Sequence, residues 1–284
     1  GGEIGRHKGL KIPRRLNSVP VRVRPRAPLL YESFYMTHFI FFHGIGIRSP
    51  FWNSIVPILE EKSLNYSLVD LDFSSLDNAF QSSKDSVKDI IKKYPDRNIV
   101  MVGHSLGGLF ATYVAQSLGD DIHKLILIAS GVAPKQISVK AIQQKQINVL
   151  YKTIKKFGMQ MMFKGYLPSW LTQSMFFTKN TPKEIQRKVW KDAVREKQSF
   201  LMEYFKSKKV WNSHFKRVHF SGPDNVLIVI CDKDKLVPRH ASMYLKDHLN
   251  GSHKVYKDCG HNDIITSEKF NKKFIDDMVL FSSI

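Results

Sequence analysis

The pentapeptide Gly103-His104-Ser105-Leu106-Gly107 is the clearest candidate for chemistry, because it matches Gly-x-Ser-x-Gly between a predicted strand and a predicted helix. A serine at such a strand-to-helix elbow has a strained backbone, and side chains at the flanking positions would collide with neighbouring elements. By composition alone, about 0.1 chance matches are expected in a chain of this length. The surrounding strand and helix make the match specific, so we predict that Ser105 is a nucleophile. His104 is expected to point away from Ser105 and to pack against its neighbours.

A serine hydroxyl needs a base to remove its proton, and the base needs an acid to fix its tautomer. In this arrangement the partners follow the serine in the order acid, then histidine, each in a loop after a late strand. Asp234 fits the acid, because it begins an Asp-x-x-Val-Pro run after an apolar strand, whereas Asp232 is a competitor that we expect at a turn or cap. His261 fits the base, because Gly260 can make the turn that presents its ring.

Hydrolysis of an acyl compound also needs donors for the developing oxyanion, each worth roughly 3 to 4 kcal/mol. Two backbone N–H groups are candidates: that of Leu106, right after the nucleophile, and that of Ile45, in the glycine-bearing loop after the first strand. We expect the substrate to contact His43, Gly44, Met161, Trp170 and Phe176. No nucleotide-binding glycine motif and no set of metal ligands is visible, so we predict no cofactor and no metal.

The elements that must position these residues alternate between strands and helices, which is typical of a parallel sheet with helices on both faces. Apolar runs predict strands at residues 38–42, 66–71, 98–102, 123–129, 226–230 and 254–256. Helical spacing predicts helices at residues 51–62, 82–94, 106–118 and 267–281. The fold class is therefore predicted to be α/β.

Between residues 134 and 221 the alternation stops, and the chain becomes helical, basic and rich in Met and aromatic residues. Because this stretch interrupts a core between two strands, we predict an inserted helical cap at 134–221 between core segments at 36–133 and 222–284. Most of its apolar residues are expected to be packed, since a helix needs one buried face. The others are expected to face substrate, because Met and aromatic side chains suit irregular apolar ligands.

Residues 1–35 differ from the rest, with eight basic residues, two acidic residues and no hydrophobic periodicity. Three interpretations are open: a transfer RNA gene read through in frame, a disordered extension, or a functional basic arm. The first rests on codons, because Val21-Arg22-Val23 can be written GTT CGA GTC, the T-loop consensus of transfer RNA. It predicts that the natural protein starts at Met36, and it is the interpretation we favour.

The whole chain has 284 residues, a formal net charge of +19, 43% hydrophobic residues and 2 Cys. This composition excludes a disulfide-stapled scaffold and wholesale disorder. No window reaches the ~18 uncharged apolar residues that a membrane span needs, and no signal peptide is evident. We therefore expect a cytoplasmic protein with reduced thiols at Cys231 and Cys259. Its lysines are spread over predicted helices, so we expect no nucleic-acid partner.

Taken together, four motifs resemble the α/β-hydrolase superfamily over nearly all of residues 36–284: His43-Gly44, the serine pentapeptide with Gly108, Asp234 with Val237-Pro238, and Gly260-His261. The resemblance implies a mostly parallel central sheet, the triad of Ser105, Asp234 and His261, and Ile45 and Leu106 as oxyanion donors. A serine at position 105 argues against the dehalogenases and epoxide hydrolases of this fold. The short strand that leads into His43-Gly44, and Lys235 beside the acid, resemble small esterases and the methylesterase/hydroxynitrile-lyase branch.

The superfamily does not determine the substrate, because one triad serves several kinds of bond. We predict a carboxylic-ester hydrolase acting on small-molecule esters with short to medium acyl chains. The alternatives are a methylesterase or thioesterase for acyl groups on an acidic carrier protein, a C–C bond hydrolase, and a binding module on a hydrolase scaffold. The carrier alternative rests on basic residues in the predicted cap, which are Lys152, Lys155, Lys156, Lys183, Arg187, Lys191 and Arg195.

Overall fold

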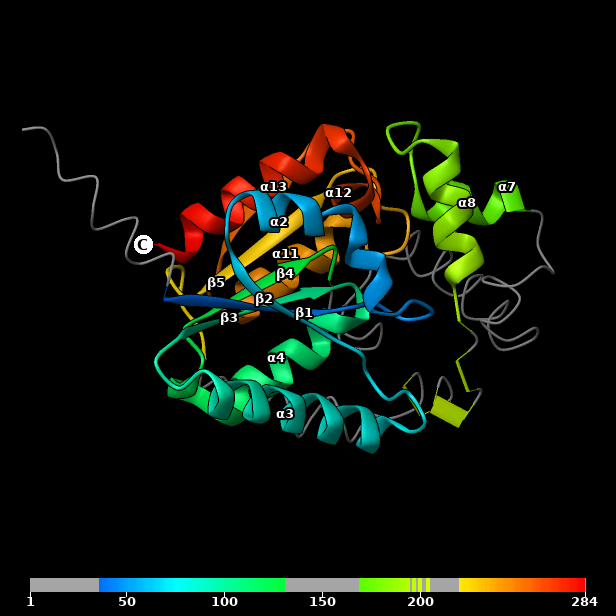
Figure 1. Ribbon diagram of the computed structural model, residues 1–284. Coiled ribbons are helices and arrows are strands. Elements are labelled where there is room, and N and C mark those ends of the chain that lie inside the picture. The colour runs from blue at the N-terminus through cyan, green and yellow to red at the C-terminus, as the bar shows by residue number, and fades with distance from the viewer. Residues whose placement is uncertain are drawn as a thin grey trace, which may run out of the picture.

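The computed structural model describes residues 36–130, 169–194, 196–197, 199–200, 203–204 and 220–283. Its centre is a sheet of six parallel strands in the order β2-β1-β3-β4-β5-β6 (Figure 1). The strands are β1 (Thr37–Phe42), β2 (Asn65–Val69), β3 (Asn98–His104), β4 (Lys124–Ile128), β5 (Val226–Cys231) and β6 (Ser252–Tyr256). The α/β prediction is confirmed, and each predicted strand lies within two residues of an observed one.

The central strands are continuous apolar runs because both faces of the sheet are buried. Successive side chains of β1 point to opposite faces, so Ile40 and Phe42 join one apolar core while Phe39 and Phe41 join the other. The same alternation runs through β3, β4 and β5. A parallel sheet of this kind needs helices on both sides.

The helices cover the two faces in sets (Figure 1). One core is closed by α3 (Leu76–Lys93), α4 (Leu106–Leu118) and α11 (Arg239–His248). The other is closed by the 3₁₀ helix η1 (Ser49–Ser54), α2 (Val56–Glu61), α12 (Asp263–Thr266) and α13 (Glu268–Ser282). A second 3₁₀ turn, η2 (Gly119–Asp121), follows α4.

Two of the predicted helices differ clearly from those observed. The helix expected at residues 51–62 is divided into η1 and α2, and Pro57 in the first turn of α2 lacks the N–H that would continue η1. Helix α3 begins six residues before its predicted start, because the Ser75 side chain accepts a hydrogen bond from the Asn78 N–H and caps it. Helix α11 was not predicted at all.

The order of the strands places the loops after β1 and β3 side by side. The chain leaves β1 toward β2 on one side and returns to β3 on the other, which makes a topological switch point. Ligands in open α/β sheets bind in the crevice at the carboxyl ends of the strands at such a point. His43-Gly44 follows β1 and Ser105 follows β3, so the topology brings two of the predicted motifs together.

Two further helices, α7 (Ser169–Phe176) and α8 (Lys183–Asp192), lie in the long connection from β4 to β5. Figure 1 shows them beyond the edge at which the strands end. They fall inside the predicted cap, whose bounds at 134 and 221 stay a prediction. The N-terminal segment 1–35 lies outside the described residues, as does 131–168.

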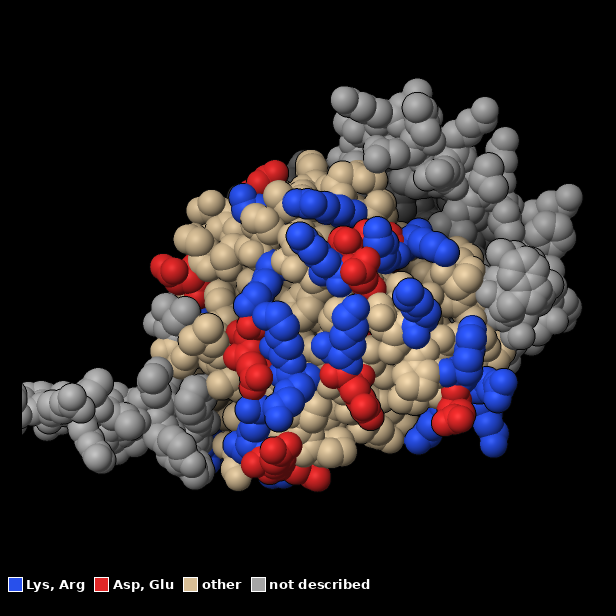
Figure 2. Space-filling model, turned by 90° about the horizontal axis from the view of Figure 1, so that it is seen from above, with Lys and Arg blue, Asp and Glu red and all other residues tan. Residues whose placement is uncertain are grey.

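The face over α2 and α13 carries many Lys and Arg side chains, with Asp and Glu interspersed (Figure 2). Lys62 forms an ion pair of 2.8 Å with Asp276, and Lys273 one of 3.3 Å with Asp277. The positive charge on this face is thus partly compensated. Among the described helices, none is long and apolar enough to cross a membrane.

Candidate active site

Ser105 occupies the elbow between β3 and α4 with φ 54° and ψ −123°, a conformation that non-glycine residues rarely adopt. Such strain costs on the order of 1–3 kcal/mol and persists only where the surroundings enforce it. Here the Ser105 N–H donates to the carbonyl of Ile128 at 2.9 Å, and the Ser130 hydroxyl donates to the Ser105 carbonyl at 2.9 Å. Residues at and just after the end of β4 therefore bind both the N–H and the carbonyl of Ser105.

The glycines of the pentapeptide are required by close backbone contacts. A Cβ on Gly107 would lie 2.4 Å from the carbonyl oxygens of Phe42 and His43, and one on Gly103 would lie 2.4 Å from the Cα of Gly108. These contacts are with backbone atoms, which cannot move away by changing a side-chain rotamer. The sequence pattern thus reflects how closely α4 packs against the ends of β1 and β3.

Asp234 and His261 form a buried pair. The His261 Nδ1–H donates to Asp234 Oδ2 at 2.7 Å, and the two side chains are 3% and 0% exposed. The other oxygen, Asp234 Oδ1, accepts the N–H groups of Leu236 and Val237 at 2.8 and 2.9 Å. Asp232 instead accepts the Cys259 N–H at 3.3 Å. The structure therefore places Asp234, and not its competitor, against His261.

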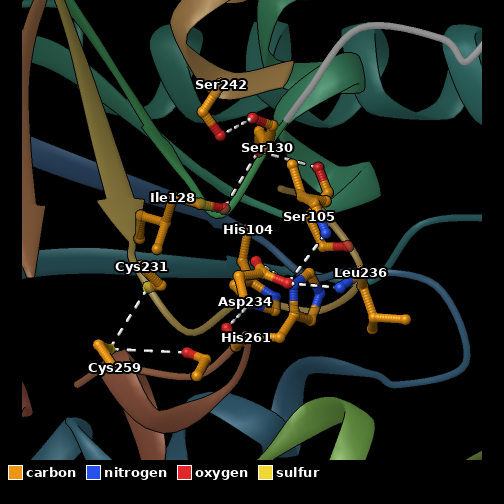
Figure 3. A network of polar contacts seen from close by, with 12 residues as sticks. His104, Ser105, Ile128, Ser130, Cys231, Asp234, Leu236, Ser242, Cys259 and His261 are labelled. Atoms are coloured by element: carbon orange, nitrogen blue, oxygen red, sulfur yellow. Dashed lines mark hydrogen bonds and ion pairs between the residues drawn. The ribbon is translucent and has the colours of Figure 1, made fainter. Parts of the chain in front are cut away.

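The His104 ring connects the base to the elbow (Figure 3). Its Nε2–H donates to the His261 carbonyl at 3.0 Å, and the two rings have centroids 4.9 Å apart. Burial is the largest cause that lowers the pKa of His104 well below its usual value, so this ring is neutral. Packing was expected of His104, but its role in holding the main chain of the base was not. The hydrogen bonds within the described part of the chain do not include one from the Ser105 hydroxyl to His261.

The two expected oxyanion donors also lie at this edge. Leu106 is the first residue of α4, where N–H groups have no partner within the helix. Gly44 is so close to the nucleophile that a Cβ added to it would lie 3.0 Å from the Ser105 Cβ. Ile45 follows in the same loop. An acyl oxygen placed near Ser105 would therefore have both backbone segments beside it.

His43 has a different position from the one expected of a substrate-binding residue. Its ring is fully buried, Nδ1–H donates to the Gly44 carbonyl at 2.8 Å, and Nε2 accepts the Leu71 N–H at 3.0 Å. Burial is the largest cause that lowers the pKa of His43 to about 4; the Arg48 charge also lowers it, while the hydrogen bond with Gly44 and the Asp70 charge oppose the shift. His43 is thus a neutral support of the loop.

The other predicted contacts have mixed outcomes. The Phe176 ring is buried against the edge of His261, with centroids 5.9 Å apart. Met161 lies outside the described residues, and so does the side chain of Trp170, whose backbone belongs to α7. Phe176 is thus the one aromatic candidate whose ring is placed at the site.

Asp263 is a buried carboxylate beside the base loop that the sequence analysis missed. Its fully buried carboxylate accepts the Gly260 N–H at 2.9 Å, the Thr178 N–H at 3.1 Å and the Thr181 hydroxyl at 2.7 Å. The Phe176 carbonyl accepts the Asn262 N–H at 2.8 Å. The loop that carries the base is thereby joined to the segment between α7 and α8, and only its proximity to His261 in sequence could have indicated this.

Cys231 and Cys259 are free, buried thiols beside the acid–base pair, with their sulfurs 3.4 Å apart (Figure 3). The hydrogen bond from Cys259 and burial raise the pKa of Cys231 well above its usual value. Within the described residues, no group of His, Cys, Asp and Glu side chains could hold a metal ion.

Comparison with known proteins agrees with this geometry. A family profile described as the alpha/beta hydrolase fold matches residues 37–268. The chain belongs to this family. The six-stranded parallel sheet and the elbow at Ser105 are thus the α/β-hydrolase framework, and the sequence resemblance is confirmed.

Relatives in this family include esterases. The chain is 25% identical over 134 residues to a pimeloyl-[acyl-carrier protein] methyl ester esterase of Proteus mirabilis, and the aligned region is 43% of this chain and 50% of that protein. It is 25% identical over 103 residues to methylesterase 17 of Arabidopsis thaliana, and the aligned region is 34% of this chain and 37% of that protein. The chain thus matches half or less of the length of these relatives.

Solved structures extend the likeness of fold along the chain. Polyneuridine aldehyde esterase superposes with a TM-score of 0.59 and 17% identity over 86% of this chain and 99% of its own. An esterase from Exiguobacterium antarcticum gives a TM-score of 0.64 and 16% identity over 87% and 92% of the two chains. At these identities the superpositions establish the α/β-hydrolase fold alone.

Proposed function

We propose that this protein is a serine hydrolase that cleaves carboxylic esters through an acyl-enzyme on Ser105. The observation that carries the proposal is the buried 2.7 Å hydrogen bond between His261 and Asp234, at the edge where Ser105 has its strained conformation. The names of the esterase relatives support an ester as the substrate.

The proposed reaction starts with attack of the Ser105 hydroxyl oxygen on the ester carbonyl carbon. Because Nδ1 of His261 carries the proton donated to Asp234, Nε2 is free to accept the serine proton. The negative charge on the carbonyl oxygen is stabilised by the N–H groups of Ile45 and Leu106. His261 then protonates the leaving alcohol, and an acyl group remains on Ser105.

Deacylation repeats these steps with water as the nucleophile. His261 removes a proton from the water, the hydroxide attacks the acyl carbon, and the same donors stabilise the second oxyanion. Collapse returns the proton from His261 to Ser105 and releases the carboxylic acid. No step requires a group beyond the residues named.

Short to medium acyl chains are the substrates we expect, because Met and aromatic side chains of the predicted cap suit apolar acyl groups and the Phe176 ring lies beside His261. The proposal is tested with p-nitrophenyl esters from acetyl to palmitoyl, comparing the wild type with Ser105→Ala. Turnover that depends on Ser105 and peaks at short or medium chains supports it. Failure of a fluorophosphonate probe to label Ser105 would instead favour a binding module on this scaffold.

A second candidate is hydrolysis of a methyl ester or thioester on an acidic carrier protein. The specific observation in its favour is that a relative is named for a pimeloyl-[acyl-carrier protein] methyl ester. Helix α8 also carries Lys183, Arg187, Lys188 and Lys191 against Glu184 and Asp192. Since exposed charges are screened by salt, hydrolysis of a carrier-bound ester should fall with ionic strength while that of a free ester should not.

A further inference from the structure

The loop that carries Ile45 is held by a carboxylate from far along the chain. Glu196, which is only 6% exposed, accepts the Gly46 N–H at 3.0 Å with Oε1. Its two oxygens also accept both ends of the Arg48 guanidinium fork, at 2.6 and 3.1 Å. Bidentate pairs of this kind are strong and fix geometry as well as energy. Glu196 lies in the connection from β4 to β5, inside the predicted cap.

The contact is reinforced by a neighbouring backbone hydrogen bond. The Val194 N–H donates to the Gly46 carbonyl at 2.8 Å, so Gly46 is bound on both of its polar groups. Gly46 has φ 75°, which places the turn of this loop at a residue without a side chain. The segment around Glu196 therefore fixes the position of the loop directly after Ile45.

The opposite side of Ile45 is fixed from the core of the protein. The Gly44 carbonyl and the Ile45 N–H belong to one planar peptide group. His43 donates to that carbonyl, and so sets the plane from which the Ile45 N–H projects. The next peptide, between Ile45 and Gly46, is the one bound by Glu196. The proposed oxyanion donor is thus held between a support within the core and a support from the predicted cap.

Packing keeps the fork of Arg48 in place. Its guanidinium lies 5.5 Å from the centre of the Phe73 ring, and that ring stacks on Phe200 at 4.7 Å. Phe200, four residues after Glu196, is fully buried. The ion pair and the aromatic stack therefore dock the same segment onto the same side of the site.

We propose that Glu196 is a positioning residue for the oxyanion hole, which is completed only when the segment bearing Glu196 docks on the loop of Gly46 and Arg48. This inference rests on the proposed ester hydrolysis and adds that the predicted cap contributes to transition-state stabilisation through the backbone of Ile45. Glu196 does not need to touch the substrate.

The test compares Glu196→Gln with Glu203→Gln in the full chain. Glutamine at 196 is nearly the same size and keeps one oxygen for Gly46, but its amide group faces the Arg48 fork in place of an acceptor. Glu203 is the matched control, because it accepts the Leu76 N–H at 2.8 Å and docks the same region on α3, away from the oxyanion loop.

We expect Glu196→Gln to lower kcat by about 10- to 100-fold with KM within about threefold, as displacement of a donor acts on the transition state. Affinity for a trifluoromethyl ketone, which forms an oxyanion with Ser105, should fall by the same factor. Glu203→Gln should leave both quantities within about twofold. Unfolding temperature is measured for each variant, because a merely structural role would change it without changing the ratio of ketone affinity to KM.

The possible failures are distinguishable. If the wild type shows no Ser105-dependent hydrolysis, the proposed function fails, and this inference fails with it. If the wild type is active and Glu196→Gln matches it, or if Glu203→Gln loses as much, this inference alone is overturned. Should Glu196→Gln not fold, Glu196→Asp keeps the charge but draws the carboxylate back by one methylene from the Gly46 N–H, and an unchanged ketone affinity in that variant also overturns it.

Discussion

Replacing Asp234 by Asn should abolish turnover while leaving the fold nearly unchanged. Two backbone N–H groups, from Leu236 and Val237, donate to Oδ1, so the amide oxygen of Asn must take that position. The amide NH₂ then lies where Oδ2 lay, 2.7 Å from Nδ1 of His261. An NH₂ group there can only donate, which forces the imidazole to carry its proton on Nε2. A ring in that tautomer cannot accept the serine proton.

The expected loss in kcat is about 10⁴-fold, which corresponds to about 5 kcal/mol of transition-state stabilisation. Stability should change little, because the Oδ1 contacts are retained. Asp234→Ala should instead leave the partly buried N–H groups of Leu236 and Val237 without their acceptor and cost about 2 kcal/mol of unfolding free energy. The assay is hydrolysis of the best p-nitrophenyl ester, with urea unfolding of each variant.

Asp232→Asn is the matched control, because this neighbouring carboxylate accepts only a 3.3 Å hydrogen bond from the Cys259 N–H and has no contact with His261. It should keep kcat within about threefold. A loss of less than about tenfold in Asp234→Asn, or an equal loss in Asp232→Asn, would refute the assignment of the acid.

Three further predictions concern the supports of the site. The pKa of buried His43 is about 4 in the folded protein and 6.5 in the unfolded chain, so the contribution of His43 to the unfolding free energy is complete above about pH 6.5 and falls by about 3 kcal/mol as the pH is lowered to about 4. Urea unfolding should show the unfolding free energy falling over this pH range, and His43→Gln should reduce that fall. Gly107→Ala should cost about 3 kcal/mol or more, because the new Cβ meets the backbone oxygens of Phe42 and His43 at 2.4 Å; a folded variant of wild-type stability would contradict the contact. Asp263→Ala should lower the unfolding free energy by about 3 kcal/mol, since buried donors from Gly260 and the α7–α8 segment lose their acceptor. It should also lower kcat, and an unchanged kcat would show that the loop of His261 keeps its position without Asp263.

The sequence predicts those parts of the fold that rest on local pattern. Strands β1, β3 and β5 can be predicted because burial on both faces requires uninterrupted apolar residues. The elbow can be predicted because close backbone contacts require its glycines. Helix α11 was not predicted, because it is short and its buried face is small: of its ten residues, only Ala241, Ser242 and Leu245 are buried. Glu196 and Asp263 could not be foreseen, since their partners lie 150 and 85 residues away and depend on how the connection from β4 docks.

Three histidine rings meet at this edge of the sheet, and their partners decide which one can take up a proton during catalysis. His43 donates from Nδ1 and accepts with Nε2, while His104 donates from Nε2 to a carbonyl, and burial lowers the pKa of both rings. His261 alone among the three is hydrogen-bonded to a buried carboxylate. In the proposed reaction, the proton removed from Ser105 is therefore assigned to His261, because its carboxylate partner can stabilise the imidazolium. His43 and His104 hold the loops on either side, so the His261 ring lies between fixed backbone segments.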